Sequence, residues 1–335
     1  MLNPMLDALT SMARMSPWDA VPFGFGLSLP SLPSLPSAAP EAKPNPKSKA
    51  GNFLSERFIA DFGSLKYKLF VPSAYDAAGA PLPLVVMLHG YGQDADDFAR
   101  GTGMNALAEK YGCLVAYPEQ SGSASGAGCW NWFERAHHHR GQGEPALIAG
   151  VATRIMSEYA VDARKVFVAG LSSGGAMAVI VGRTYPDLFA AVGCHSGLAH
   201  GAARDSFGAM QAMLYGAGVD AHYGRQGADS VPTIVFHGDL DSTVHPNNAR
   251  HVVEQTIRAG AGFVTSREIG EATGRIFTRV IHRSTSGGVV AEQWTLHGAG
   301  HAWSGGSRRG SYTDATGPDA SEEMMRFFLQ SAPAC

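Results

Sequence analysis

Short apolar runs alternate with amphipathic stretches along most of this 335-residue chain. Each apolar run ends in polar or glycine-rich residues, which is typical of a buried strand that leads into a loop. The stretches between them repeat apolar residues at the spacing of one helix face. Strands, each with the polar or glycine-rich residues that follow it, are predicted within residues 81–90, 113–120, 165–170, 189–197, 232–241 and 291–301. Helices are predicted at 94–112, 145–160, 174–186 and 321–330.

This alternation predicts the fold class. Strand–helix–strand units place parallel strands in one sheet and cover both faces with helices. Ligands bind such sheets at the carboxyl ends of the strands, and the polar residues of chemical interest directly follow predicted strands. We therefore expect an α/β protein whose site lies at that edge of a mostly parallel sheet.

The first 52 residues differ in character from the rest of the chain. Ser-Leu-Pro occurs three times between Ser28 and Ser37, and proline at this density disfavours helix and sheet. We predict a flexible leader or linker over residues 1–52 and one catalytic domain over residues 53–335. The opening residues lack the basic start, the continuous apolar stretch and the cleavage site of a signal peptide.

Composition excludes several classes of function. The net charge of −3 gives no electrostatic footprint for nucleic acid or a membrane surface, and no apolar run approaches the ~18 residues of a membrane span. The four cysteines contain no CxxC pair, which argues against a zinc site built on thiolates. Their even number permits two disulfides, and reduced, buried thiols are the alternative. The histidines of residues 137–140 are expected on a solvated loop rather than around a metal ion, so we expect no metal. Composition leaves the oligomeric state open.

Ser172 is the predicted nucleophile. It stands at the centre of Gly170-Leu171-Ser172-Ser173-Gly174, between a predicted strand and a predicted helix. In this setting the chain turns so sharply that the central serine adopts a strained backbone conformation and exposes its hydroxyl. A side chain at Gly170 or Gly174 would clash across the turn, which explains both glycines. The helix that follows directs its N-terminus at developing negative charge.

A serine hydroxyl needs a base to accept its proton and a carboxylate to orient that base. In this arrangement the acid follows the serine along the chain and the histidine comes last. Asp239 and Asp241 both follow a predicted strand; we favour Asp241, because the loop needs room to turn toward the histidine. His301 lies between the final strand and the final helix and is favoured over His297, which ends the strand.

The transition state also requires donors for its oxyanion. The backbone N–H of Ser173, directly after the nucleophile, is the first expected donor. The second is expected from the loop that follows the early strand, where the amide of Tyr91 lies between Gly90 and Gly92. The glycines allow close approach of the backbone to a substrate.

Several motifs together resemble the poly(3-hydroxybutyrate) depolymerase-like esterases of the α/β-hydrolase fold, a family that extends to feruloyl and acetylxylan esterases. The motifs are LHGYGQDADDFA, YGCLVAYPEQ, CWNWF, RGQGEPALIAG, GLSSGGAMA, HGDLDSTVHP and GAGHAWSGG. The resemblance implies that Ser172, Asp241 and His301 form the triad. It further implies an extracellular enzyme without cofactor that acts on an ester, usually a hydroxyalkanoate polymer or its oligomers. The separate substrate-binding domain of many polymer-degrading members is not evident here.

Four further residues are candidates for substrate binding. Trp130 and Trp132 follow a Gly/Ser-rich loop, Trp303 lies two residues beyond His301, and His195 follows a predicted strand. The indoles of Trp130 and Trp132 either line an apolar pocket or pack the loop onto the core, and Trp303 has the better claim to the site by its position. His195 either borders the pocket or belongs to a turn. Residues 197–230 are rich in small residues and are expected to form a cap or substrate-binding loop.

Two other functions compete with a polyhydroxyalkanoate esterase. A feruloyl or acetylxylan esterase would use the same catalytic residues on plant polysaccharide esters. A polymer- or granule-surface binding protein would use the leader for attachment, but it would have no need for a nucleophile, an acid and a base together.

Overall fold

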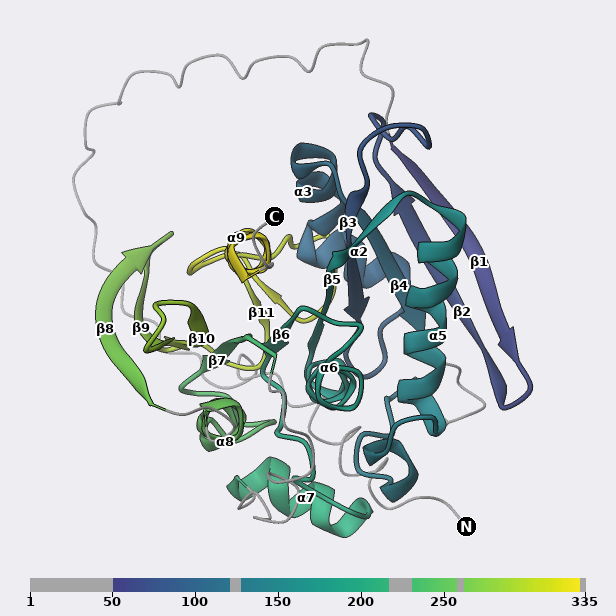
Figure 1. Ribbon diagram of the computed structural model, residues 1–335. Coiled ribbons are helices and arrows are strands. Elements are labelled where there is room, and N and C mark those ends of the chain that lie inside the picture. The colour runs from purple at the N-terminus through teal and green to yellow at the C-terminus, as the bar shows by residue number, and fades with distance from the viewer. Residues whose placement is uncertain (1–50, 121–127, 217–230, 258–261, 332–335) are drawn as a thin grey trace, which may run out of the picture. The chain divides into compact units, whose positions relative to one another are not determined.

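A ten-stranded sheet runs through the computed structural model, which describes residues 51–120, 128–216, 231–257 and 262–331. The strand order is β1-β2-β4-β3-β5-β6-β7-β10-β9-β8 (Figure 1). The strands are β1 (Asn52–Ala60), β2 (Gly63–Val71), β3 (Leu82–Leu88), β4 (Leu114–Glu119), β5 (Val161–Leu171), β6 (Ala191–His195), β7 (Thr233–Gly238), β8 (Phe263–Ala272), β9 (Arg275–Ser284) and β10 (Val289–Leu296).

The six predicted strands form the parallel centre of this sheet. Neighbouring strands from β4 through β3, β5, β6 and β7 to β10 pair in parallel, as expected for buried apolar runs. Two antiparallel hairpins, β1–β2 and β8–β9, extend the sheet at its two edges. The pattern of apolar residues does not predict these hairpins. The fold class itself is confirmed.

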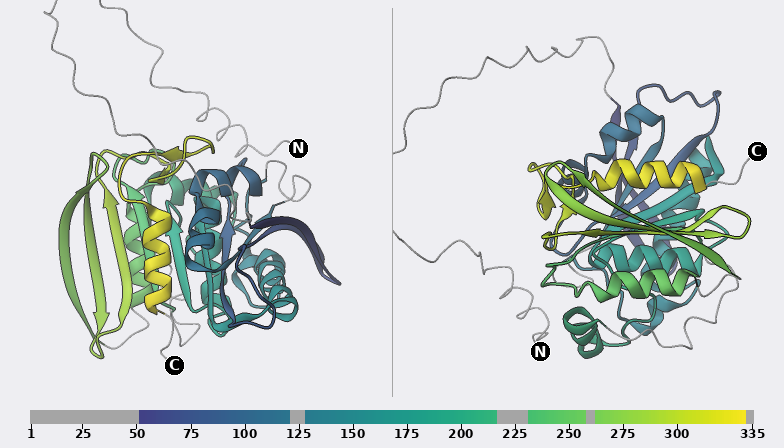
Figure 2. Two further views of the ribbon diagram at one scale, coloured as in Figure 1. Left: turned by 90° about the horizontal axis from the view of Figure 1, so that it is seen from above. Right: turned by 90° about the vertical axis from the view of Figure 1, so that its left-hand side faces the viewer.

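Helices cover both faces of the sheet. The helices α2 and α3 pack on β4 and α9 packs on β5–β7, whereas α5, α6 and α8 contact strands from the opposite face (Figure 2). The helices are α2 (Ala95–Thr102), α3 (Met104–Tyr111), α5 (Gly143–Glu158), α6 (Ser173–Thr184), α7 (Ser206–Tyr215), α8 (Asn247–Ile257) and α9 (Ala320–Ser331), with a 3₁₀ helix η1 (Arg135–His138).

The predicted helix over residues 94–112 is two helices. Asp94 caps α2 by accepting a hydrogen bond from the Asp97 N–H, and Gly112 ends α3, as expected. Gly103 separates the two because its φ of 66° lies in the left-handed region, which interrupts a right-handed helix. The helices α7 and α8 were not predicted.

Three further predictions concern the leader, the cysteines and a membrane span. Residues 1–50 of the predicted leader lie outside the described residues, so the leader stays a prediction. Its last predicted residue, Asn52, begins β1. Cys113 and Cys194 are buried thiols outside any disulfide, which excludes the two-disulfide alternative here. In the described part of the chain, no helix is long and apolar enough to cross a bilayer.

Candidate active site

Ser172 occupies the sharp turn between β5 and α6. Its backbone has φ 57° and ψ −118°, a strained conformation for a residue other than glycine. A Cβ at Gly170 would lie 2.4 Å from the Gly174 carbonyl oxygen, and a Cβ at Gly174 would lie 2.1 Å from the Leu88 oxygen. A side chain at Gly170 would therefore clash across the turn, as predicted, whereas one at Gly174 would clash with the end of the neighbouring strand β3. Ser172 remains partly exposed.

Asp241 and His301 form a hydrogen-bonded pair after β7 and β10. Asp241 Oδ2 lies 2.7 Å from His301 Nδ1, and the two side chains are 0% and 11% exposed. The other carboxylate oxygen, Oδ1, accepts hydrogen bonds from the backbone N–H groups of Thr243 (2.9 Å) and Val244 (2.8 Å). This geometry fixes the carboxylate and leaves His301 Nε2 for a different partner.

A second histidine, His237, also contacts the Asp241 carboxylate. His237 Nε2 lies 3.3 Å from Asp241 Oδ2 and 2.8 Å from the Val244 carbonyl oxygen, so it is the nitrogen that carries the proton. Burial alone would raise the pKa of Asp241, but hydrogen bonds from His237 and His301 outweigh it and hold the pKa well below its usual range. Asp241 is therefore ionised at neutral pH.

His237 was missed by the sequence analysis. The available signal was its position on the same strand end as Asp241, in His237-Gly238-Asp239-Leu240-Asp241.

The alternative pair, Asp239 and His297, is also hydrogen-bonded. Asp239 Oδ2 lies 2.8 Å from His297 Nδ1, while Asp239 Oδ1 accepts a hydrogen bond from the Gly298 N–H (2.7 Å). The ring's other nitrogen lies 2.9 Å from the Thr278 hydroxyl. This pair is exposed at the surface, and both nitrogens of its histidine already have partners, so the ring has no nitrogen left for Ser172. The pair instead joins the turn after β7 to the turn after β10.

His195 links the segments that carry Ser172 and His301. Its carbonyl oxygen accepts the Ser172 N–H (2.9 Å), and its Nε2 accepts the Ser304 N–H (3.0 Å), three residues beyond His301. Its Nδ1 lies 3.1 Å from the Ser196 hydroxyl. Burial lowers the pKa of His195 to about 3, and neighbouring histidines add to this effect. The ring is therefore neutral and able to accept.

The predicted role of His195 in substrate binding is not supported by this position. The side chain has no exposed surface, and both ring nitrogens already have partners. A positioning role explains the contacts better.

The three tryptophans are likewise buried. Trp130 is fully buried and donates from Nε1 to the His89 carbonyl oxygen (3.1 Å), while Trp303 donates to the Ser321 hydroxyl (3.0 Å). Trp132 is buried and packs edge-on against Phe133. These indoles hold loops onto the core and offer almost no surface to a substrate, which favours the packing alternative over the pocket alternative.

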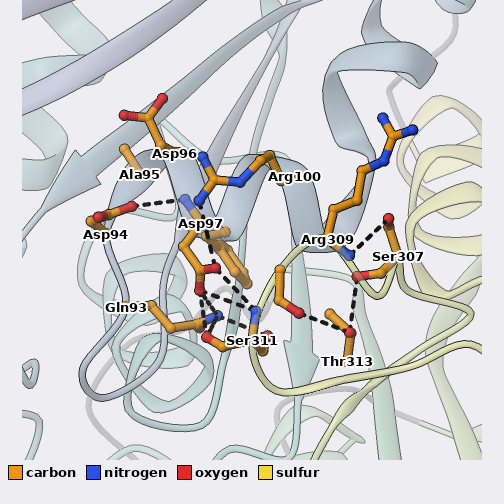
Figure 3. Close-up of polar contacts among 12 residues, drawn as sticks. Gln93, Asp94, Ala95, Asp96, Asp97, Arg100, Ser307, Arg309, Ser311 and Thr313 are labelled. Carbon is orange, nitrogen blue, oxygen red and sulfur yellow. Dashed lines mark hydrogen bonds and ion pairs between the residues drawn. The ribbon is translucent and has the colours of Figure 1, made fainter.

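The loop after β3 carries Tyr91. The Gly90 N–H donates to Gln93 Oε1 (2.9 Å), so the side chain of Gln93 braces the turn in which Tyr91 lies. Gln93 Nε2 in turn donates to Asp97 Oδ2 (3.0 Å) and to the Ser311 carbonyl oxygen (3.1 Å) (Figure 3). The sequence does not predict this role of Gln93, because its partner Ser311 is distant along the chain.

Ser173 begins α6. The first N–H groups of a helix have no acceptor within that helix, so its amide is suited to bind negative charge beside Ser172.

The histidines of residues 137–140 are not all solvated, contrary to the prediction. His138 belongs to η1 and is buried. Among the described residues, no group of three or more His, Cys, Asp or Glu side chains is arranged to hold a metal ion.

The parallel sheet and the serine at its strand–helix turn define the α/β-hydrolase fold class. Residues 65–276 match the family model for Esterase PHB depolymerase, more than half of the chain. The chain therefore belongs to this esterase family.

Known relatives include more than one kind of esterase. Poly(3-hydroxyalkanoate) depolymerase C of Paucimonas lemoignei is 32% identical over 248 residues, covering 71% of this chain and 58% of that protein. Probable acetylxylan esterase A of Aspergillus fumigatus is 31% identical over 208 residues, covering 58% and 54%. The chain thus spans little more than half the length of these relatives. The solved acetyl xylan esterase from Aspergillus awamori matches with a TM-score of 0.63 and 22% identity, covering 83% of this chain and 99% of that one.

Proposed function

We propose that the protein hydrolyses carboxylic esters with Ser172 as nucleophile, His301 as general base and Asp241 as the residue that orients His301. The observation that carries this proposal is the buried 2.7 Å contact between Asp241 and His301. The strained backbone of Ser172 supports it, since strain of this kind accompanies nucleophiles at strand–helix turns.

In this mechanism His301 Nε2 accepts the Ser172 proton as Oγ attacks the ester carbonyl. The backbone amides of Tyr91 and Ser173 stabilise the resulting oxyanion, and each such donor is worth about 3 kcal/mol. The protonated His301 then gives its proton to the departing alcohol, which leaves an acyl-serine. Water attacks this acyl group with His301 again as base, and the acid product leaves.

We further propose a polyhydroxyalkanoate or its oligomers as the substrate. Membership of the Esterase PHB depolymerase family and the similarity to a poly(3-hydroxyalkanoate) depolymerase support this choice. The test is clearing of a poly(3-hydroxybutyrate) suspension by the wild type and by Ser172→Ala. We expect clearing by the wild type alone. Equal clearing by both proteins would contradict the assignment of Ser172, and no clearing by either would contradict the polymer substrate.

An acetylxylan esterase is the second candidate, because a relative with that name is 31% identical. This candidate would be favoured if the protein released acetate from acetylated xylan but did not clear the poly(3-hydroxybutyrate) suspension. The same triad would act in both cases, so Ser172→Ala would again abolish turnover.

A further inference from the structure

Tyr312 combines a strained backbone with an exposed aromatic ring. Its φ of 51° lies in the left-handed region, which bulky side chains rarely adopt. Its side chain is 41% exposed, so burial of the ring does not offset the strain. Strain of this kind persists where the surrounding structure imposes it and collects at functional sites.

The segment around Tyr312 is held from several sides. The backbone N–H of Trp303 donates to the Tyr312 carbonyl oxygen (2.7 Å). This bond lies beside the short parallel pairing of β11 (Trp303–Ser304) with β12 (Thr313–Asp314). The Ser311 N–H donates to Asp97 Oδ1 (3.0 Å), as does the Ser311 hydroxyl to the same carboxylate (Figure 3). Apart from the bond of the Ser311 hydroxyl, these bonds use backbone atoms of residues 311 and 312, and none of them uses the Tyr312 side chain. The fold therefore does not require a tyrosine at this position.

A second set of contacts fixes the segment from its other end. Arg275 Nη2 lies 2.7 Å from Asp314 Oδ2, and Arg275 Nη1 donates to the His297 carbonyl oxygen (2.9 Å). The Thr313 hydroxyl donates to the Ser307 carbonyl oxygen (2.9 Å). The backbone that presents Tyr312 is therefore rigid on both sides.

These contacts place Tyr312 between the two loops of the proposed active site. Its carbonyl is bonded to Trp303, two residues beyond His301, and Gln93 joins the preceding residue to the turn that carries Tyr91. Burial raises the pKa of the Tyr91 hydroxyl, and the Cys129 thiol and the Tyr312 hydroxyl add to this rise.

We propose that Tyr312, together with the side chain of Tyr91, forms an aromatic subsite that binds the apolar part of the ester substrate. This inference rests on the proposed ester hydrolysis and adds a determinant of its specificity. Aromatic rings bind both aliphatic chains and other rings, so the subsite suits either an alkanoyl chain or an aromatic group. A backbone that is already fixed in place does not have to be ordered when the substrate binds, which lowers the entropic cost of binding.

The left-handed backbone allows a sharp test. Tyr312→Gly removes the ring and relieves the strain, so the variant is expected to fold at least as stably as the wild type. Tyr312→Phe keeps the ring. Thr273→Gly is the matched control, because Thr273 has a φ of 46° in the β8–β9 turn and the change relieves similar strain there.

The assay measures kcat and KM for two ester series. The acyl series is 4-nitrophenyl acetate, butyrate and hexanoate, and the alcohol series is ethyl acetate and 2-naphthyl acetate. In at least one series, we expect the KM of the wild type to fall as the apolar group grows. In Tyr312→Gly this dependence should disappear, with KM about tenfold higher for the preferred ester and kcat changed less than threefold, on the scale of one lost aromatic contact. Tyr312→Phe and Thr273→Gly should match the wild type.

A Tyr312→Gly variant with wild-type KM across both series would overturn the subsite while leaving the proposed hydrolysis intact. A wild-type protein that hydrolyses none of these esters would instead overturn the proposed function and the subsite with it. Loss of the dependence in the acyl series alone would identify an alkanoyl chain as the bound group, and loss in the alcohol series alone would identify the alcohol.

Discussion

Replacement of Asp241 or of Asp239 by asparagine distinguishes the role of the Asp241–His301 pair from that of the Asp239–His297 pair. In Asp241→Asn, the oxygen of the new amide must face the N–H groups of Thr243 and Val244, because these donate to Oδ1. The amide NH₂ then occupies the position of Oδ2, 2.7 Å from His301 Nδ1. There it donates to Nδ1 and forces the proton of His301 onto Nε2, which can no longer accept a proton from Ser172.

The size of the effect follows from this wrong tautomer. Loss of a correctly oriented base in a serine triad lowers kcat about 10⁴-fold, or roughly 5 kcal/mol of transition-state stabilisation. The amide would also face the N–H of His237, which lies 3.3 Å from Oδ2, so some stability should be lost as well. Asp239 and His297 have side chains that are 36% and 40% exposed, and an exposed pair of this kind contributes about 0–1 kcal/mol. Asp239→Asn should therefore retain activity within about threefold.

The assay is steady-state hydrolysis of 4-nitrophenyl butyrate by the two variants, with urea unfolding to confirm that both are folded. If Asp239→Asn lost as much kcat as Asp241→Asn, or if Asp241→Asn kept wild-type kcat, the assignment of the catalytic carboxylate would be wrong.

Three further predictions concern the supporting structure. His195→Phe keeps the ring that stacks on Trp303 but removes the acceptor for the Ser304 N–H, so kcat should fall about tenfold or more while His195→Gln recovers part of it in the same kinetics. Gly174→Ala places a Cβ 2.1 Å from the Leu88 oxygen and should lower the free energy of unfolding by several kcal/mol, whereas Gly288→Ala, with its nearest contact at 3.7 Å, should be tolerated. Burial lowers the pKa of both His195 and His200 to about 3, so between about pH 6.5 and 3 these two side chains bind protons in the unfolded chain but not in the folded one. The free energy of unfolding in urea should therefore fall by about 1.4 kcal/mol per pH unit for each histidine as the pH drops through this range. A free energy of unfolding that stays constant from pH 7 to 5 would contradict this prediction.

The sequence predicts the centre of the sheet better than its edges. The strands from β3 to β7 contain buried apolar runs that identify them, and β10 is half-buried. The edge strand β8 is almost entirely exposed and shows no apolar run. Its pairing with β9 depends on a two-residue turn at Thr273 and Gly274, a weak signal within a long polar stretch.

The proposed catalytic residues were predictable because each carries a local signature. Two glycines mark Ser172, and strand ends mark Asp241 and His301. The residues that support them are not locally marked. His195 acts on Ser304 and Gln93 on Ser311, partners that only the folded sheet brings together. For the tryptophans, the sequence shows that an indole lies near the site but not whether it faces the substrate or the core.

The most direct test of the central claim is the mass of the protein after incubation with a fluorophosphonate, followed by peptide mapping. The proposed mechanism predicts one adduct on Ser172 in the wild type and in Ser173→Ala, and none in Ser172→Ala or after denaturation. An adduct on a different residue, or a wild-type protein that stays unmodified while folded, would contradict the assignment of Ser172 as the nucleophile of an ester hydrolase.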